Sequence, residues 1–282
     1  MQVIHTIEQL QSELNGKGKI GIVPTMGNLH DGHLALVEEA KKHCDFLVVS
    51  IFVNRLQFGP NEDFDTYPRT LDEDCQKLQQ QCKADIVFAP SEKDMYPEEQ
   101  TYKICPDPRM ADILEGFYRK GFFTGVCTVV GKLFSIVRPD IAVFGKKDYQ
   151  QLQIIRGMVR QFGMPIQIIG HELQRDKKSG LALSSRNRYL SAEELVQAPE
   201  LYHVLQQVKK RIESGDNNIA ALEIRAVEVL THHGWEPDYV AVVRQRDLLA
   251  PTRDDVMMKE PLVVLAAAKI GKTRLIDNVE IF

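Results

Sequence analysis

The sequence lacks any long uninterrupted run of apolar residues. Its longest apolar stretches, such as residues 262–268, fall far short of the roughly 18 residues that suggest a membrane span. The first residues also lack the basic-then-apolar pattern of a signal peptide, because Gln9, Glu13 and Asn15 soon interrupt any hydrophobic run. We therefore expect a soluble, cytoplasmic protein that is not exported by that route and does not bind a membrane.

An excess of positive charge and paired cysteines are missing as well. The 282 residues include 39 acidic and 35 basic side chains, which gives a net charge of −4. This balance excludes a polybasic nucleic-acid-binding protein, although a small local patch can still bind an anion. The five cysteines are odd in number and scattered, with no C-x-x-C pair. We expect reduced, mostly structural thiols and neither a zinc ribbon nor a disulfide framework.

The first two-thirds of the sequence alternates short β-branched apolar runs with longer helical patterns. The predicted strands cover residues 19–24, 46–53, 85–89, 141–145 and 166–170. The predicted helices between them include residues 34–40, 72–83, 128–136 and 149–162. Alternation of this kind is typical of βαβ units, so we expect an α/β fold with a Rossmann-like doubly wound parallel sheet over residues 1–174.

The pattern changes after a polar loop at residues 176–180. Residues 175–282 predict a second, smaller α+β domain. Its predicted helices lie around residues 193–214 and 218–232, and its predicted strands around residues 239–243, 262–269 and 275–282. The polar loop between the two domains suggests that the C-terminal domain acts as a lid.

The strongest local motif is PTMGNLHDGH at residues 24–33, where the first long strand turns into a helix. Ligands of open parallel sheets bind at the carboxyl ends of strands, and a helix that opens there favours phosphate. Gly27 and Gly32 let a nucleotide approach the backbone, and His30 and His33 can donate hydrogen bonds to phosphate oxygens. Two alternatives remain open, metal ligation and solvated helix-start residues, but a zinc pair usually has i, i+4 spacing with an adjacent glutamate.

Two further segments follow predicted strands. Asn54 and Gln57 are amides suited to orienting a small polar molecule, or turn residues that end a strand. In FGKKDYQQ a lysine can neutralise phosphate, Asp148 can cap a helix or hold a ribose hydroxyl or a cation, and Gln151 lies one turn into the helix. The alternative for this segment is a solvated charge run.

A third segment, LALSSRNR, follows the polar loop and groups hydroxyl and guanidinium side chains. It can close over triphosphate oxygens, or it can simply cap a helix. The sequence contains neither the G-x-x-x-x-G-K-[ST] phosphate loop nor a G-x-G-x-x-G fingerprint. A kinase of the P-loop type and a Rossmann dehydrogenase are therefore disfavoured.

Taken together, five segments resemble the pantoate–β-alanine ligases, or pantothenate synthetases, a family of the HIGH-motif nucleotidyltransferase superfamily. The segments are PTMGNLHDGH, FVNRLQF, YPRTLDEDC, FTGVCTVVGKLFSIVRPDIAVFGKKDYQQL and LALSSRNRYLS. The resemblance implies an ATP- and Mg²⁺-dependent, AMP-forming condensation of D-pantoate with β-alanine through a pantoyl adenylate. It also implies a cytoplasmic homodimer in pantothenate and coenzyme A biosynthesis.

The resemblance also implies roles for individual residues. The catalytic residues are His30, His33, Lys147 and Arg186, with His33 as the proton donor. Pantoate is bound by Gln57 and Gln151, and β-alanine by Gln57. The ATP-binding residues are Met26, Gly27, Asn28, Leu29, His30, Asp31, Gly32, His33, Gly145, Lys146, Lys147, Asp148, Gln174, Leu183, Ser184, Ser185 and Arg186.

Three features bear on how closely the family pattern applies. Arg55 stands where the family usually has proline, and Lys146 replaces a common glutamate, so only Lys147 matches the catalytic lysine. The acidic residues 72–74 resemble the region near the family's magnesium, or form a solvated helix start. The alternatives to the ligase are another H-x-G-H adenylyltransferase, acting on a phosphorylated substrate, and a nucleotide-binding module without catalysis.

Overall fold

Six short strands form a parallel sheet in the N-terminal part of the computed structural model, which describes residues 1–60, 62–82 and 84–282. The strands are β1 (Gln2–Ile4), β2 (Ile20–Thr25), β3 (Phe46–Ile51), β4 (Ile86–Phe88), β5 (Ile141–Gly145) and β6 (Gln167–His171). Their order across the sheet is β1-β4-β3-β2-β5-β6. The predicted α/β fold with a Rossmann-like parallel sheet is thereby confirmed.

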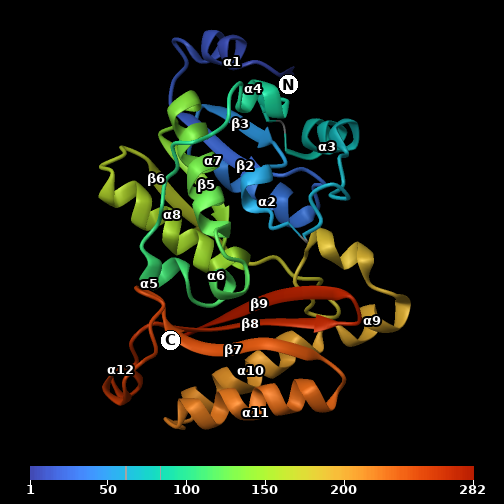
Figure 1. The fold of residues 1–282 in the computed structure, drawn as a ribbon, viewed down its shortest axis with the longest axis vertical. Helices are drawn as coiled ribbons and strands as arrows, with labels where there is room; N and C mark the ends of the chain where they lie inside the picture. The colour runs from blue at the N-terminus through green and yellow to red at the C-terminus, as the bar shows by residue number, and fades with distance from the viewer. Residues whose placement is uncertain (61, 83) are drawn as a thin grey trace. The chain divides into compact units, whose positions relative to one another are not determined.

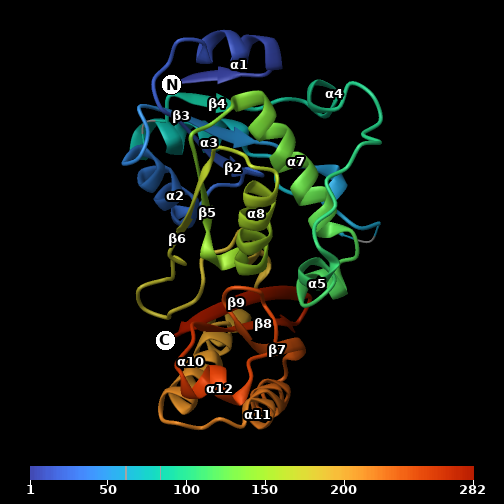
Figure 2. The same ribbon diagram turned by 90° about the vertical axis from the view of Figure 1, so that its left-hand side faces the viewer.

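Helices cover both faces of this sheet, with α2 and α3 on one side and α7 and α8 on the other (Figure 2). The helices are α1 (Ile7–Leu14), α2 (Asp31–Lys41), α3 (Leu71–Lys77), α4 (Glu92–Met95), α5 (Pro108–Ala111), α6 (Glu115–Tyr118), α7 (Phe122–Val137) and α8 (Tyr149–Gln161). A π-helical turn, Leu78–Cys82, continues α3. The predicted helix 72–83 ends on Lys83, which lies outside the described residues.

The core on the α2 side is built from apolar residues of the strands and of one helix face. Leu34, Val37 and Ala40 project from α2 onto Val23 of β2 and Val49 of β3, and all five side chains are buried. Their i, i+3, i+6 spacing places them on one face of the helix. Packing of that face fixes α2 against the sheet, and with it the residues at the start of α2.

A second sheet has three antiparallel strands in the order β7-β8-β9 (Figure 1). The strands are β7 (Glu236–Arg244), β8 (Leu262–Ile270) and β9 (Thr273–Ile281). The helices of this part are α9 (Ala192–Gln197), α10 (Glu200–Glu213), α11 (Ile219–His232) and α12 (Arg253–Met257). Apolar residues of α10 and α11 pack against the strands around Trp235, which is 2% exposed. The smaller α+β part is thus confirmed.

The chain divides into two compact units. The N-terminal unit comprises Met1–Lys146 and Ile154–Glu172, and the C-terminal unit comprises Lys147–Gln153 and Leu173–Phe282. Residues 147–153, which include the start of α8, therefore group with the second sheet. Within the described ranges, no helix is long and apolar enough to span a membrane.

Candidate active site

The order of the large sheet indicates where a ligand is expected to bind in the N-terminal unit. From β2 the chain proceeds through β3 and β4 towards one edge of the sheet, whereas β5 and β6 extend it towards the other edge. The strand order therefore reverses between β2 and β5, and ligands of such sheets bind at the carboxyl ends of the strands at this point. The residues that follow β2 are Met26 to His33, the strongest motif of the sequence.

The loop after β2 is held by a buried carboxylate. Asp74 of α3 is fully buried, and its carboxylate accepts the backbone N–H groups of Asn28 at 2.8 Å and of Leu29 at 2.7 Å. The Thr70 hydroxyl donates to the same group at 3.1 Å. Gly27 and Asn28 have positive φ angles of 79° and 52°, so the loop turns through the left-handed region where these residue types are tolerated.

Asp74 corrects one of the sequence expectations. The solvated helix start expected for residues 72–74 holds for Asp72 and Glu73, which are exposed, but not for Asp74, and the alternative of proximity to magnesium stays a prediction. Asp74 instead points inward, and its carboxylate accepts backbone N–H groups of the loop after β2. Lys77, one turn later, donates its Nζ to the Leu29 carbonyl at 2.7 Å. Two residues of α3 therefore hold this loop.

The two histidines of the motif lie side by side, with ring centroids 4.1 Å apart. His30 is the N-cap of α2, and its Nδ1 accepts the Gly32 N–H at 3.1 Å. The Nδ1 of His33 accepts the His30 N–H at 3.4 Å. A ring nitrogen that accepts a hydrogen bond carries no proton, so these bonds assign the Nε2–H tautomer to both neutral rings. In this tautomer the Nε2–H of each ring is a hydrogen-bond donor, which is the type of group that a phosphate oxygen accepts from.

The amides after β3 are linked to this loop. The Nε2 of Gln57 lies 3.0 Å from the Met26 Sδ. Asn54 is 1% exposed, and its Nδ2 donates to the Gln57 Oε1 and to the Gly125 carbonyl, both at 3.1 Å. Asn54 is therefore a buried positioning residue, whereas Gln57 is only partly buried. The structure thus brings Met26 and Gln57 together.

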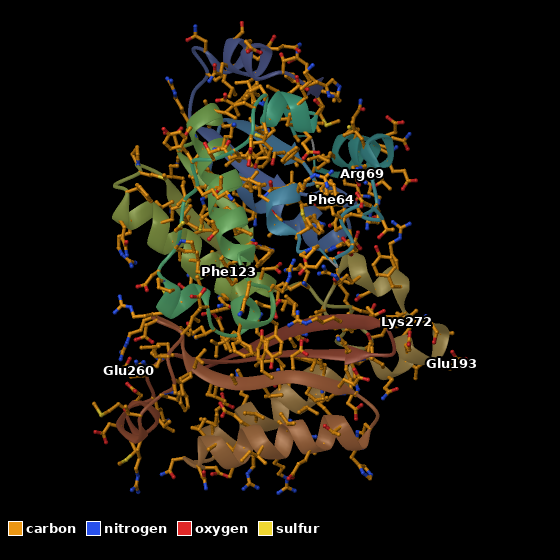
Figure 3. All side chains as sticks on the ribbon, in the orientation of Figure 1. Phe64, Arg69, Phe123, Glu193, Glu260 and Lys272 are labelled. Carbon is orange, nitrogen blue, oxygen red and sulfur yellow. The ribbon has the colours of Figure 1, made fainter. Side chains whose placement is uncertain are left out.

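Helix α7 approaches this turn at Gly125. A Cβ at Gly125 would lie 2.1 Å from the Leu56 carbonyl oxygen, so only glycine permits this packing. Arg55, which stands in place of the family's proline, keeps the 3-10 turn Arg55–Gln57. Its side chain pairs with Glu92 at 2.9 Å and lies over the ring of Phe64, which is labelled in Figure 3. The substitution is thus accommodated at the surface of the turn.

A hollow of about 580 Å³ opens beside Gln57 in the N-terminal unit. Phe58, Glu62 and Arg119 are among the residues that line it. Arg119 pairs with Glu62 at 2.6 Å and donates to the Gln57 carbonyl at 3.3 Å. No sequence motif marks Arg119, because its partners Gln57 and Glu62 lie far earlier in the chain. The hollow has the size of a small-molecule site.

At the end of β5, Lys146 forms an ion pair within the N-terminal unit. Its Nζ lies 2.5 Å from the Glu172 carboxylate. Gly145 and His171 are paired across β5 and β6, so Lys146 and Glu172 both follow the last pair of these strands. This placement explains how a lysine is accommodated where the family usually has glutamate.

The C-terminal unit holds the other lysine, Lys147. Its carbonyl accepts the Nδ2 of Asn278 at 3.0 Å, and its Nζ lies 3.9 Å from the Asp148 carboxylate. The hydroxyl of Tyr149 donates to Glu280 at 3.0 Å. Gln151 lies in the first turns of α8, as expected, and is partly buried. Strand β9 therefore anchors the segment that carries Lys147, Asp148 and Gln151.

The polar loop of the C-terminal unit closes on itself. The Leu183 N–H donates to the Gln174 carbonyl at 2.9 Å, which brings two expected ATP-binding positions together. Arg175 forms two hydrogen bonds of 2.7 Å with Asp277, lies 3.8 Å from the ring centre of Tyr202 and donates to the Gly180 carbonyl. The pair of Arg175 and Asp277 fixes both ends of the loop.

Ser184 and Arg186 lie directly after this loop. Ser184 is the N-cap of the 3-10 helix Ser185–Tyr189, and its hydroxyl accepts the Arg186 N–H at 3.2 Å. The capping alternative from the sequence therefore holds for Ser184. Capping uses one lone pair of this hydroxyl, and its proton stays available to a phosphate oxygen.

A family model of the pantoate-beta-alanine ligases matches residues 2–280. The chain belongs to this family. It is similar to the pantothenate synthetase from Thermus thermophilus, with 40% identity, a TM-score of 0.92 and full coverage of both chains. It is also similar to a pantoate-beta-alanine ligase from Francisella tularensis that was crystallised with beta-gamma ATP and beta-alanine. That comparison gives 37% identity, a TM-score of 0.81, and coverage of 99% of this chain and 97% of the other.

Membership of the ligase family decides between the functional alternatives. The chain is an enzyme, a pantoate–β-alanine ligase of pantothenate biosynthesis. The comparisons support this activity and not an adenylyltransferase that acts on a phosphorylated substrate.

Proposed function

We propose that this ligase joins pantoate to β-alanine through a pantoyl adenylate, and that His30, His33, Gln57, Lys147 and Arg186 are its main functional residues. The observation that carries the proposal is the match of the family model over residues 2–280. The two Nε2–H donors and the Gln57 amide at one sheet edge support it. ATP is the co-substrate, AMP and pyrophosphate are the co-products, and the bond that forms is an amide.

In the first step a carboxylate oxygen of pantoate attacks the α-phosphorus of ATP, and the bond to pyrophosphate breaks. Negative charge then grows on the phosphate oxygens. We propose that this negative charge is stabilised by two imidazole rings, two cationic side chains and two hydroxyls. These groups belong to His30 and His33, to Lys147 and Arg186, and to Ser184 and Ser185. Removing one preorganised donor of this kind costs about 10²- to 10³-fold in rate. The proposed ATP site also includes residues 26–33, 145–148 and 183, and the backbone of Gln174.

Pantoate is oriented by neutral amides. Gln57 and Gln151 are the proposed ligands of its hydroxyl and carboxylate groups, and Gln57 also meets β-alanine. The Nδ2 of Asn54 donates to the Gln57 Oε1, which leaves the Gln57 Nε2–H donors for substrate and for Met26. Holding the reactants in line supplies several kcal/mol of the rate enhancement.

In the second step the neutral amine of β-alanine attacks the carbonyl carbon of the adenylate. The C–O bond to AMP breaks, AMP leaves with its electron pair, and the amine nitrogen loses one proton to solvent. His33 is the proposed proton donor to the phosphate oxygens. This chemistry needs no covalent enzyme nucleophile. Burial raises the pKa of the Cys82 thiol to about 11 and that of the Cys127 thiol to about 12, so both thiols remain protonated near neutral pH.

Magnesium, the assembly and the location of the enzyme are also part of the proposal. Mg²⁺ is usually held by substrate phosphates with one or two carboxylates. Among the described residues no group of three acidic, histidine or cysteine side chains is arranged to hold a metal. The ion is therefore proposed to arrive with the ATP phosphates, where it neutralises their charge. We further propose a cytoplasmic homodimer that binds small molecules and no nucleic acid.

The C-terminal unit is proposed to act as a lid. Chain crossings after Lys146, Gln153 and Glu172 connect it to the N-terminal unit. Closure on ATP would shield the adenylate from water. Small-angle scattering with and without ATP tests this role, and identical profiles contradict it.

The proposed activity is tested by product analysis after incubation with ATP and Mg²⁺, with pantoate and β-alanine each omitted in turn. The proposal expects AMP and pantothenate only when both substrates are present. Formation of ADP, or of a dinucleotide, contradicts it. The variant His33→Ala serves as a control against contaminating enzymes, because it removes a proposed proton donor of the same chain.

A further inference from the structure

Strand β9 of the C-terminal unit presents different side chains on its two faces. Leu275, Val279 and Ile281 pack into the core with α10 and α11. Because side chains alternate along a strand, Asn278 and Glu280 belong to the opposite face. This opposite face of β9 is where Asn278 and Glu280 contact the start of α8.

Two residues of β9 hold two residues of the Lys147 segment, at matched spacing. The Asn278 Nδ2 donates to the Lys147 carbonyl at 3.0 Å, and the Tyr149 hydroxyl donates to Glu280 at 3.0 Å. The two bonded residues are two positions apart on each segment. Asn278 is 5% exposed and Tyr149 is 3% exposed, so each bond has one buried side chain.

The bond to the Lys147 carbonyl acts on the direction of the Lys147 side chain. The carbonyl belongs to the 3-10 turn Lys146–Asp148, a single short turn with poorer hydrogen-bond geometry than an α-helix. Fixing the planar peptide group after Lys147 restricts its ψ angle and so the direction of its Cα–Cβ bond. Asp277, the residue before Asn278, is within electrostatic reach of this lysine: burial raises the pKa of Asp277, whereas the hydrogen bonds from Arg175 and the positive charges of Arg175 and Lys147 oppose that rise.

We propose that Asn278 is a positioning residue for Lys147, and that β9 thereby sets the position of the lysine ammonium for adenylate formation. The inference rests on the proposed function, which places that ammonium at the ATP phosphates. Asn278 acts on the backbone of Lys147 and is not itself assigned a contact with substrate. Small displacements of a catalytic group lower the rate of the chemical step more than they weaken substrate binding.

The kinetic test is a double-mutant cycle with Asn278→Ala and Lys147→Ala. We expect Asn278→Ala to lower kcat for AMP formation about 10-fold while the KM for pantoate changes by less than about twofold. In the Lys147→Ala background the same substitution should change kcat by less than about twofold, because the group that it positions is gone. An equal loss in both backgrounds would show a general structural role and overturn the proposal.

The matched control is Asn218→Ala. Asn218 is in the same unit and caps α11, where its Oδ1 accepts the Ala221 N–H at 3.3 Å. The control therefore also removes an asparagine hydrogen bond, at a position that the proposed site does not use. It should leave kcat within about twofold of the unsubstituted enzyme. A loss equal to that of Asn278→Ala would contradict the proposal.

A second readout does not depend on activity. Amide hydrogen exchange of residues 146–153, measured without substrates on the full chain, should become faster in Asn278→Ala and stay unchanged in Asn218→Ala. Unchanged exchange in Asn278→Ala overturns the inference even if the enzyme makes pantothenate. Conversely, an enzyme that forms no AMP contradicts the proposed function, while the exchange rates still decide whether Asn278 holds Lys147.

Discussion

The Asp74 carboxylate accepts the backbone N–H of Asn28 at 2.8 Å, across 46 residues of sequence and in the interior of the N-terminal unit. Asn28 has a positive φ angle and lies between β2 and the histidines of α2. The hydrogen bond therefore fixes the loop that carries the proposed phosphate donors. A carboxylate is well suited to holding the loop, because its two oxygens accept hydrogen bonds from two backbone N–H groups and one hydroxyl at once.

The substitution Asp74→Asn should destabilise the protein and the site together. The amide nitrogen of the new side chain would face a backbone N–H and leave it unsatisfied, at a cost of about 1–3 kcal/mol. Urea unfolding should show this loss, and kcat should fall because the loop loses its anchor. Glu73→Gln, at the neighbouring exposed position of the same helix turn, should change neither quantity appreciably. Equal effects of the two substitutions would contradict the anchoring role.

Both histidines of the motif should be Nε2–H tautomers when neutral. This follows from the backbone N–H groups that donate to each Nδ1. Nitrogen-15 NMR of the imidazole rings at about pH 8, above the ordinary histidine pKa, distinguishes the two tautomers. Nδ1–H signals for His30 and His33 would contradict the assignment.

His33→Ala should also lower kcat by about 10²- to 10³-fold if the ring donates to the reacting groups.

The two adjacent lysines should respond differently to alanine substitution. Lys147→Ala should lower the turnover at least about 10²-fold, because it removes a charge proposed to stabilise the departing pyrophosphate. Lys146→Ala breaks a partly exposed ion pair with Glu172, and such pairs contribute only about 0–1 kcal/mol. Steady-state kinetics of both variants checks this difference. A larger loss of turnover in Lys146→Ala than in Lys147→Ala would mean that Lys146, and not Lys147, is the catalytic lysine.

Stability at acid pH should depend on Glu39 of α2. Hydrogen bonds from Lys42 and His43 lower the pKa of Glu39 to about 2, below its ordinary value of 4.5. Because the pKa is lower in the folded state, the stabilisation is complete above pH 4.5 and is lost as the pH falls towards 2. Glu39→Gln should therefore cost about 1 kcal/mol near neutral pH, after screening by solvent, and almost nothing at about pH 2. Urea unfolding at both pH values checks this, and an equal difference at the two would contradict it.

Much of the fold could be predicted because the apolar runs are regular. The predicted strand 141–145 coincides with β5, and the predicted strand 19–24 is displaced from β2 by one residue. Strand β1 was missed because its three residues, Gln2–Ile4, are too few to form a pattern. The predicted helix 193–214 is in fact α9 and α10. Pro199 stands between them, and its ring removes a backbone donor, so the break was visible in the sequence.

The candidate site was predictable only where its residues form local motifs. His30, His33, Gln57 and Lys147 lie in contiguous segments at strand ends, which is why pattern and spacing could single them out. The contacts of Asp74, Arg119 and Asn278 were not predicted, because each acts on a backbone group far away in the sequence. A single buried carboxylate or amide has no sequence signature until the fold shows what it contacts.

Activation of pantoate as an adenylate can be tested by following one oxygen atom through the reaction. Pantoate labelled with ¹⁸O in its carboxylate is incubated with the enzyme, ATP, Mg²⁺ and β-alanine, and the AMP is analysed by mass spectrometry. Attack of the carboxylate on the α-phosphorus, followed by departure of AMP, transfers one labelled oxygen to AMP. We predict one ¹⁸O for each AMP molecule formed, whereas unlabelled AMP, or label in inorganic phosphate, would contradict the account.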